Sequence, residues 1–438
     1  MRDRTEIAAF SLEALKKAGL EKSECHLRFT RSDELNLDSG EISLLRTTDD
    51  VSLTLTGIVE NRKGSVTINR TDGRSLDEAA ARVLDMAVSS EPDGANDISP
   101  RQPSGEFDRG PDGPDLDLMY RRMKDFLEYS TEKYPSLILE QAILDFSAVR
   151  KYYLNSNGVD LRSRRGCYSF FPMFTSKEGK DTSSFNYSVV SMTGLDRELQ
   201  DYGIIDELME QSTGQVRSRE FQGKFSGDVI ITPDCLEDFL SMTCMYLGDY
   251  PMIKGTSIFR DSLGAEIAHP GLTLRSMPLS DELAHGYFIT HDGYAAADST
   301  IIENGVLRTF LLSLYGSNKT GKARSVNSGG AFVVDPGKES REELVSSVKK
   351  GILLCRFSGG MPSESGDFSG VAKNSYYIED GRIRHPVREI MISGNLRDLL
   401  MNLDGISSER VNSGSSILPW IKARDISIFG KQGSSSTG

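Results

Sequence analysis

Several features of secreted and membrane proteins are missing from this sequence of 438 residues. No apolar run approaches the roughly 18 residues that a membrane-spanning helix needs. The N-terminal residues contain no apolar h-region of a secretory signal. The five cysteines are scattered and odd in number, so they indicate buried thiols in a reducing compartment rather than a disulfide framework. We therefore expect a cytoplasmic protein with no membrane partner.

The sequence also lacks the excess of basic residues that is typical of nucleic-acid-binding proteins. Its net charge is -13, whereas phosphate binding needs a positive surface. Arg162, Arg164 and Arg165 lie close together, but three arginines in an acidic chain are more typical of a solvated loop or strand edge. We expect no nucleic-acid partner.

Hydrophobic spacing and turn residues divide the chain into units, and its length predicts two or three domains. We expect mixed or antiparallel sheet in the C-terminal unit, with a barrel-like closure as one option, and an α+β fold class overall. The predicted units are an N-terminal α+β domain at 1–91, a linker at 92–114, a central α+β domain at 115–226, a C-terminal β-rich domain at 227–432 and a polar tail at 433–438.

Capping signals predict where two of the helices begin. Ser75 is the expected N-cap of a helix in the N-terminal unit, and Glu78 would complete a capping box. Thr232 and Pro233 follow the apolar strand 227–231, with Thr232 as N-cap and Pro233 at the first helical position.

Turns and short strands follow one another in a fixed order in the second half of the chain. No single turn is specific, because Glu-Asn-Gly and its relatives are common hairpin signals. Their order and spacing nevertheless resemble the TldD/TldE (PmbA) metallopeptidase family over the whole chain, most specifically after residue 226. The segments that carry the resemblance include 155–158, 229–247, 255–259, 301–307, 311–315, 351–353 and 366–396.

Catalytic members of that family (TldD type) carry His-Glu-x-x-x-His on the helix after the first strand of the third unit. Two imidazoles there can bind a divalent metal, and the glutamate handles the proton of the metal-bound water. Counting back from 255–257, these positions are occupied by Leu240, Ser241 and Met245 in this chain. The helix instead has an apolar stripe that is typical of core, formed by Leu236, Phe239, Leu240, Thr243 and Leu247.

The cysteine ligand of the catalytic members is also missing, since the corresponding region 412–416 contains no thiol. The chain therefore resembles the TldE/PmbA half of the family. That resemblance implies no metal and no catalytic residue in this chain. It also implies a zinc or iron ion in a TldD-type partner subunit.

The resemblance places peptide binding near the glycine-rich turns of the C-terminal unit. Glycine lets a peptide backbone approach a strand edge, as in strand addition. A β-turn with glycine at positive φ explains these residues equally well without a ligand. The candidates are Gly359, Gly360, Gly366, Asp367, Phe368, Ser369 and Asn395.

Two histidines form a weaker alternative site. His285 and His291 lie close in sequence, with Asp281, Glu282 and Asp292 nearby, and imidazole with carboxylate suits zinc or iron. The segment 280–293 reads as a polar loop that runs into a strand, so the metal interpretation ranks below the loop interpretation.

The leading functional hypothesis is a non-catalytic subunit of a TldD/TldE-type metallopeptidase that degrades or matures peptides. Such a subunit would form a heterodimer with a TldD-type partner and would supply chamber wall and peptide contacts. The alternatives are a stand-alone homodimer that binds peptides, and a hydrolase that uses His285 and His291. An older name of the family, modulator of DNA gyrase, finds no support in these residues.

Overall fold

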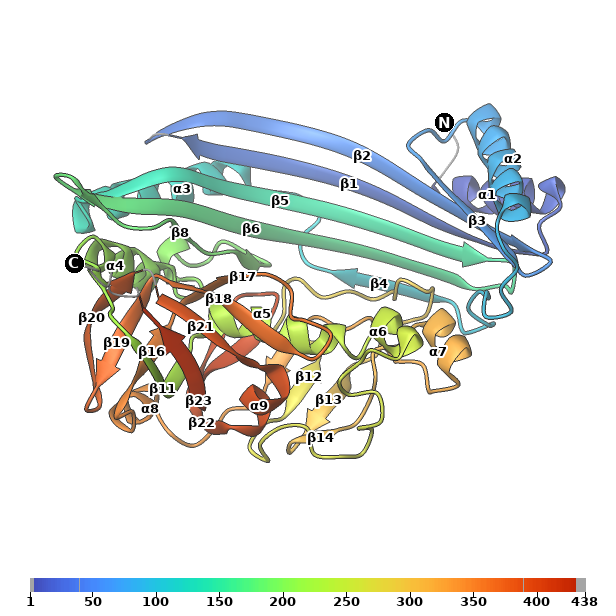
Figure 1. Ribbon diagram of the computed structural model, residues 1–438. Helices are drawn as coiled ribbons and strands as arrows, with labels where there is room; N and C mark the ends of the chain where they lie inside the picture. Colours follow the sequence, from blue (N-terminus) through green and yellow to red (C-terminus); the bar gives the residue numbers. More distant parts are fainter. Residues whose placement is uncertain (1–3, 39, 389, 431–438) are drawn as a thin grey trace, which may run out of the picture.

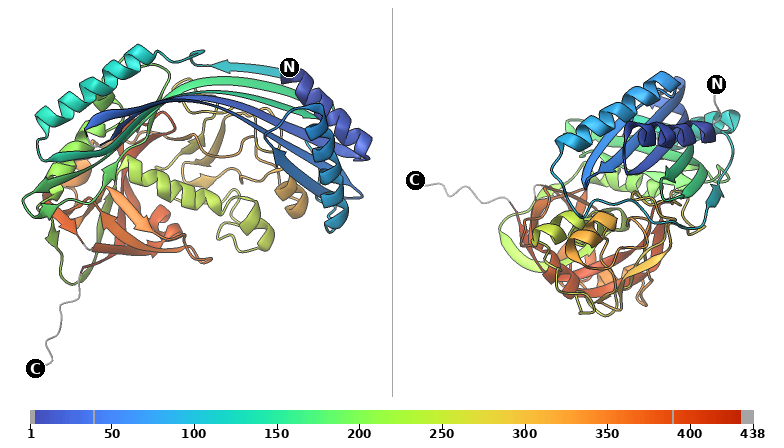
Figure 2. Two further views of the ribbon diagram at one scale, coloured as in Figure 1. Left: turned by 90° about the horizontal axis from the view of Figure 1, so that it is seen from above. Right: turned by 90° about the vertical axis from the view of Figure 1, so that its right-hand side faces the viewer.

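A long, mostly antiparallel sheet arches over the rest of the molecule (Figures 1 and 2). The computed structural model describes residues 4–38, 40–388 and 390–430, so the predicted polar tail 433–438 lies outside the described residues. The strand order is β3-β2-β1-β5-β6-β4, with β7, β8 and β9 attached to β6. The strands are β1 (Lys22–Asp38), β2 (Glu41–Val59), β3 (Arg62–Ile68), β4 (Gly105–Arg109), β5 (Leu137–Asn155), β6 (Asp160–Glu178), β7 (Asp181–Thr182), β8 (Asn186–Tyr187) and β9 (Val190–Met192).

This sheet joins strands from the two units that the sequence analysis kept apart. β1 pairs with β5 from Glu24–Asn155 to Asp38–Gln141. The predicted linker 92–114 contains β4, which pairs with β6 in parallel. The arch is thus continuous across the predicted linker, and the domain boundaries themselves stay a prediction.

Helices cover the convex side of the arch, α1 and α2 at one end and α3 at the other (Figures 1 and 2). They are α1 (Arg4–Ala18), α2 (Gly73–Ser89) and α3 (Leu116–Lys133). The predicted N-cap of α2 was wrong. Asp72 caps the helix, and its carboxylate accepts a hydrogen bond from the backbone N–H of Ser75 at 3.0 Å. The helix begins earlier because an aspartate oxygen reaches the N3 amide as well as a serine oxygen does.

The C-terminal half is built on a mixed sheet of 14 strands around β11 and β23. β11 pairs in parallel with β16 and antiparallel with β23, and the described strands do not close into a barrel. The strands are β10 (Arg219–Glu220), β11 (Lys224–Ile231), β12 (Leu274–Ser276), β13 (Ser299–Glu303), β14 (Val306–Leu307), β15 (Phe332–Val334), β16 (Lys350–Leu354), β17 (Arg356–Gly359), β18 (Asp367–Lys373), β19 (Ser375–Glu379), β20 (Arg382–Arg388), β21 (Ile390–Asn395), β22 (Leu403–Asn412) and β23 (Ile417–Phe429).

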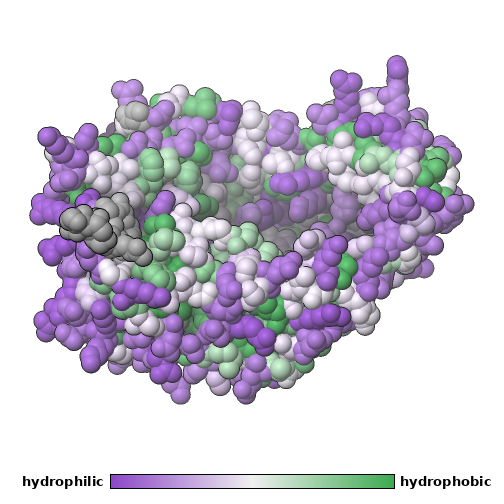
Figure 3. Space-filling model, in the orientation of Figure 1, coloured by the Kyte–Doolittle hydropathy of each residue, from purple (hydrophilic) through white to green (hydrophobic). Residues whose placement is uncertain are grey.

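Short helices connect these strands, and α5 begins as the sequence predicts, with Thr232 as N-cap and Pro233 at the first helical position. The remaining helices are η1 (Leu199–Asp201), α4 (Ile205–Gln215), α5 (Pro233–Met245), α6 (Asp249–Lys254), α7 (Leu314–Thr320), α8 (Arg341–Ser346) and α9 (Leu396–Met401). None of the described helices is long and apolar enough to cross a membrane. The space-filling view shows a hollow between the arch and the C-terminal half (Figure 3).

Candidate functional site

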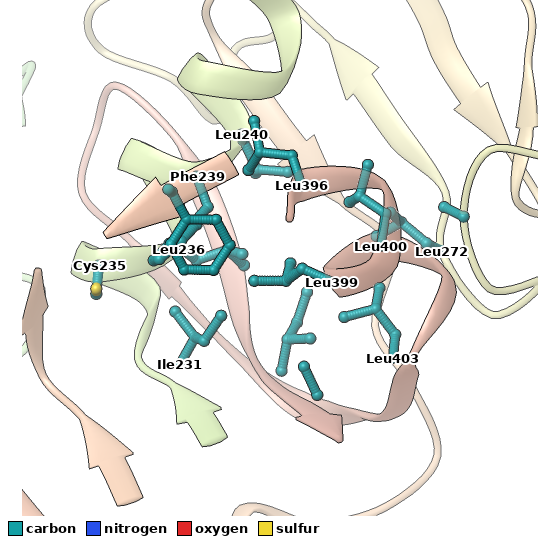
Figure 4. Close-up of a cluster of buried hydrophobic side chains, with 14 of the residues drawn as sticks. Ile231, Cys235, Leu236, Phe239, Leu240, Leu272, Leu396, Leu399, Leu400 and Leu403 are labelled. Carbon is teal, nitrogen blue, oxygen red and sulfur yellow. The ribbon is translucent and has the colours of Figure 1, made fainter. Parts of the chain in front are cut away.

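Helix α5 carries positions 240, 241 and 245, which the sequence analysis aligned with the metal-binding motif, and its buried face is part of the core. Leu240 is 2% exposed and points into a cluster of leucines, next to Leu396 at the start of α9 (Figure 4). Ser241 and Met245 lie outside this cluster, and Met245 is 36% exposed. The predicted apolar stripe of α5 is confirmed, because Leu236, Phe239, Leu240, Thr243 and Leu247 are all buried.

The opposite face of α5 borders a cavity of about 890 Å³. Ser241 lines it, together with the edge strand β17 and the segment 182–189. We call this cavity the acidic cleft, because four carboxylates line it against two basic side chains. The carboxylates are Glu140, Asp234, Glu237 and Asp238, and the basic side chains are Arg356 and Lys373.

Burial changes the protonation of the acidic cleft. It raises the pKa of Asp234 to about 6, although the positive charge of Arg356 lowers that pKa in part. Burial also raises the pKa of Glu237 and of Asp238. The guanidinium of Arg356 lies 3.4 Å from the ring centroid of Tyr187 and donates to the backbone oxygen of that residue. The cleft therefore combines carboxylates that gain protons easily with one anchored cation.

The segment 412–416, which the sequence analysis compared with a cysteine ligand region, contacts α5 in this structure. Ser416 Oγ donates to Glu237 Oε2 at 2.8 Å, and Ser413 and Ser415 line the acidic cleft. The two regions that the resemblance pairs are thus in contact, with hydroxyl and carboxylate groups between them. Sequence analysis did not single out Asp234, Glu237 or Asp238. Their signal is helical spacing, since all three lie on one side of α5 away from the apolar stripe.

The predicted peptide residues Gly359 and Phe368 lie on neighbouring strands. β17 pairs with β18 on one side and with no other described strand. The Phe357 ring leaves no room for a Cβ at Gly359, whose added carbon would lie 2.5 Å from it. Phe368 is buried, with its ring centroid 5.3 Å from that of Phe239 and 5.9 Å from that of Phe357.

Most of the remaining candidates surround a second cavity, of about 880 Å³, which Gly360, Asp367, Phe368, Ser369 and Asn395 help to line. Asn395 holds the turn before β18 together. Its Nδ2 donates to Asp367 Oδ1 and to the Ser365 backbone oxygen, both at 2.9 Å, while its Oδ1 caps α9. The Asn395 amide also holds the pKa of Asp367 below its usual value. Gly366 has φ +90° and completes this turn.

The two candidate histidines reach the same third cavity, of about 540 Å³. His26 lines that cavity too, from the first strand of the arch, although sequence analysis did not group it with His285 and His291. Arg28, Lys151 and Arg165 also line it, and their positive charge disfavours a bound cation. The two histidines therefore share a cavity, but one whose charge suits an anion.

Comparison with known proteins places the chain in a family. The family model described as "PmbA/TldA metallopeptidase C-terminal domain" matches residues 222–430. The model described as "PmbA/TldA metallopeptidase domain 1" matches residues 27–87. A protein of Haemophilus influenzae named "Metalloprotease PmbA homolog" is 24% identical over 441 residues, covering 94% of each chain. A "Metalloprotease" of Methanothermobacter thermautotrophicus is 30% identical over 200 residues, which are 43% of this chain and 43% of that protein.

The fold agrees with this assignment. The crystal structure of TldE from Thermococcus kodakarensis matches with a TM-score of 0.82 at 18% identity, over 97% of this chain and 100% of that chain. At that identity the match supports the fold alone. With both domain descriptions and the full-length relative in agreement, the chain belongs to the TldD/PmbA metallopeptidase family.

Proposed function

We propose that this chain is the non-catalytic subunit of a TldD/TldE-type metallopeptidase. One observation supports the proposal above all: the residues at the three motif positions of α5. Leu240 and Met245 stand where the motif has its metal-binding histidines, and Leu240 is packed in the core. Ser241 stands where the motif has its glutamate and has no carboxylate. Proteolysis by the complex then depends on a TldD-type partner. When bound in that partner, zinc or iron would activate water and polarise the amide carbonyl.

The contribution of this chain is peptide contact and chamber wall. One edge of β17 pairs with β18, and residues of β17 line the acidic cleft. Gly359 and Ser358 are exposed at the end of that strand, so an extended peptide can lie against the strand there. The turn cavity around Asp367 and Asn395 is the second candidate contact.

Co-purification tests the proposal directly. This chain and a TldD-type subunit are co-expressed, and peptide cleavage is measured for each chain alone and for the pair, with and without EDTA. Cleavage is expected only with both chains present, and EDTA is expected to abolish it. A pair in which Ser358 is replaced by proline keeps every metal ligand of the partner but blocks strand addition at β17. It should lose cleavage of extended peptides while still co-purifying.

Three outcomes would overturn the proposal. EDTA-sensitive cleavage by the pure chain alone would make it an enzyme, and stoichiometric zinc or iron in it would point to a hydrolytic site such as His285 with His291. A stable homodimer that binds peptides but not the TldD-type subunit would instead support the stand-alone binding protein.

A further inference from the structure

The third cavity has an unusual concentration of positive charge for a chain of net charge -13. It lies between the concave face of the arch and the loop that follows β12. We call it the basic cavity, and its volume is about 540 Å³. Its basic lining residues are His26, Arg28, Lys151, Arg165, His285 and His291.

Strand register brings the three strong cations together. Arg28 on β1 is directly opposite Lys151 on β5. Arg165 on β6 is opposite Val149, two residues from Lys151, and side chains two apart on a strand share a face. Like charges directly opposite each other destabilise a sheet. The sequence therefore maintains a repulsive arrangement on the inner face of the arch.

No carboxylate neutralises these cations among the described residues. Neither Arg28, Lys151 nor Arg165 has an ion-pair partner within 4.0 Å there. Arg165 donates to the Gly286 backbone oxygen, and its Nε is buried without a partner. A buried donor without a partner is uncommon in folded proteins and calls for an explanation.

The acidic groups nearest the cavity have partners elsewhere. Asp292 binds Arg324 through two contacts of 2.7 and 2.8 Å. Glu24 accepts a hydrogen bond from Tyr153 at 2.9 Å, and burial raises its pKa, which favours the uncharged form. These carboxylates do not offset the charge of the cavity.

Burial and the repulsion between the basic groups lower the pKa of two of them. Burial and then the charges of Arg28 and Arg165 lower the pKa of Lys151. His285 lines the cavity, and burial and then the charges of Arg165, Lys151 and Arg28 lower its pKa to about 4. An anion in the cavity would offset the repulsive part of these shifts.

We infer that the basic cavity binds a carboxylate group of a peptide. Arginine and lysine donate charge-assisted hydrogen bonds to carboxylates, and arginine can do so with two parallel bonds. The cavity lies within the roughly 300–1,000 Å³ range of small-ligand pockets, so it can admit more than a single ion. Tyr153, Tyr287 and Ile289 supply apolar surface for the residue that carries the carboxylate.

This inference rests on the proposed peptide-handling function, and it names the part of the peptide that the arch would recognise. The carboxylate can come from the C-terminus of a peptide or from an aspartate or glutamate side chain. Both sources present the same group, and the experiment separates them.

Isothermal titration calorimetry of the full chain at low ionic strength tests the inference, because salt screens such contacts. Three N-acetylated pentapeptides are used. The first is uncharged except for its free C-terminus, the second is the same peptide amidated, and the third is amidated with one internal glutamate. Inorganic phosphate is titrated separately. The expected result is that removal of the only carboxylate weakens binding about tenfold or more.

The variants Arg28→Gln and Lys151→Gln should each weaken binding of the carboxylate peptide about tenfold. Arg150→Gln is the matched control, because Arg150 is adjacent to Lys151 but points to the opposite face of β5. It removes the same charge and should leave binding unchanged. Circular dichroism melting confirms that each variant is folded.

Preference for the free C-terminus or for the internal glutamate identifies the carboxylate that binds, and either one supports the inference. Equal affinity for all three peptides would overturn it. So would binding of phosphate alone, or an Arg150→Gln effect as large as that of Lys151→Gln. The proposed function is judged separately, by co-purification with a TldD-type subunit, which these peptide titrations do not involve.

Discussion

Truncation of Leu240 tests whether helix α5 is core or site. Leu240 is 2% exposed, and Leu240→Ala removes three carbons from the cluster shown in Figure 4. At about 0.8 kcal/mol for each buried CH₂, the lost transfer energy is about 2.4 kcal/mol. The cavity left among α5 and α9 adds to this, because packed leucines relax only in part. The free energy of unfolding should therefore fall by about 3–4 kcal/mol.

Met245→Ala on the same helix is the matched control. Met245 is 36% exposed, so its truncation should cost about 1 kcal/mol or less. Urea unfolding followed by tryptophan fluorescence measures both, since Trp420 is the only tryptophan of the chain and is 5% exposed on β23. Equal losses for the two variants would refute the view that position 240 serves the core. Leu240→His should cost at least as much as Leu240→Ala, because it also buries a polar ring.

Three further predictions follow from single contacts. Gly366→Ala should cost about 1–2 kcal/mol in urea unfolding because φ is +90°, whereas Gly360→Ala, with open space around it, should stay within about 0.5 kcal/mol. Arg324→Gln should cost about 3 kcal/mol, because it leaves the largely buried carboxylate of Asp292 without its ion-pair partner, and unchanged stability would contradict this. Burial raises the pKa of Asp145 from 3.8 to about 6. The buried carboxyl therefore ionises between about pH 4 and about pH 6, and the free energy of unfolding of the wild type falls over that range. Asp145→Asn should therefore gain stability relative to wild type as pH rises from about 4 to about 6, as urea titrations at several pH values would show.

Local signals were sufficient for much of the C-terminal half. The start of α5 was predicted from Thr232 and Pro233, because capping depends on residues that are adjacent in sequence. The apolar stripe of α5 was predicted for the same reason, since one helix turn brings its members together. The family assignment from the order of the turns was confirmed as well.

Contacts between distant segments could not be predicted in this way. The pairing of β1 with β5 joins residues more than a hundred positions apart, and neither strand carries a local signal of its partner. The same limit applies to the basic cavity. His26 and Lys151 appear in the sequence as ordinary positions of two unrelated strands, and only the register places them beside the loop of His285.

Residues recognised by their turn chemistry are selected by local geometry, whether or not they bind a ligand. Gly366 is glycine because the turn needs positive φ, and Asn395 is asparagine because its amide ties that turn to Asp367 and caps α9. A family motif built on such residues therefore indicates the fold, and does not by itself indicate a binding site. The basic cavity has the opposite property, since its charges are brought together by long-range strand pairing and repel one another. Charges that the fold does not need are the stronger indication of a ligand, which is why the carboxylate test addresses Arg28 and Lys151 rather than the conspicuous turns.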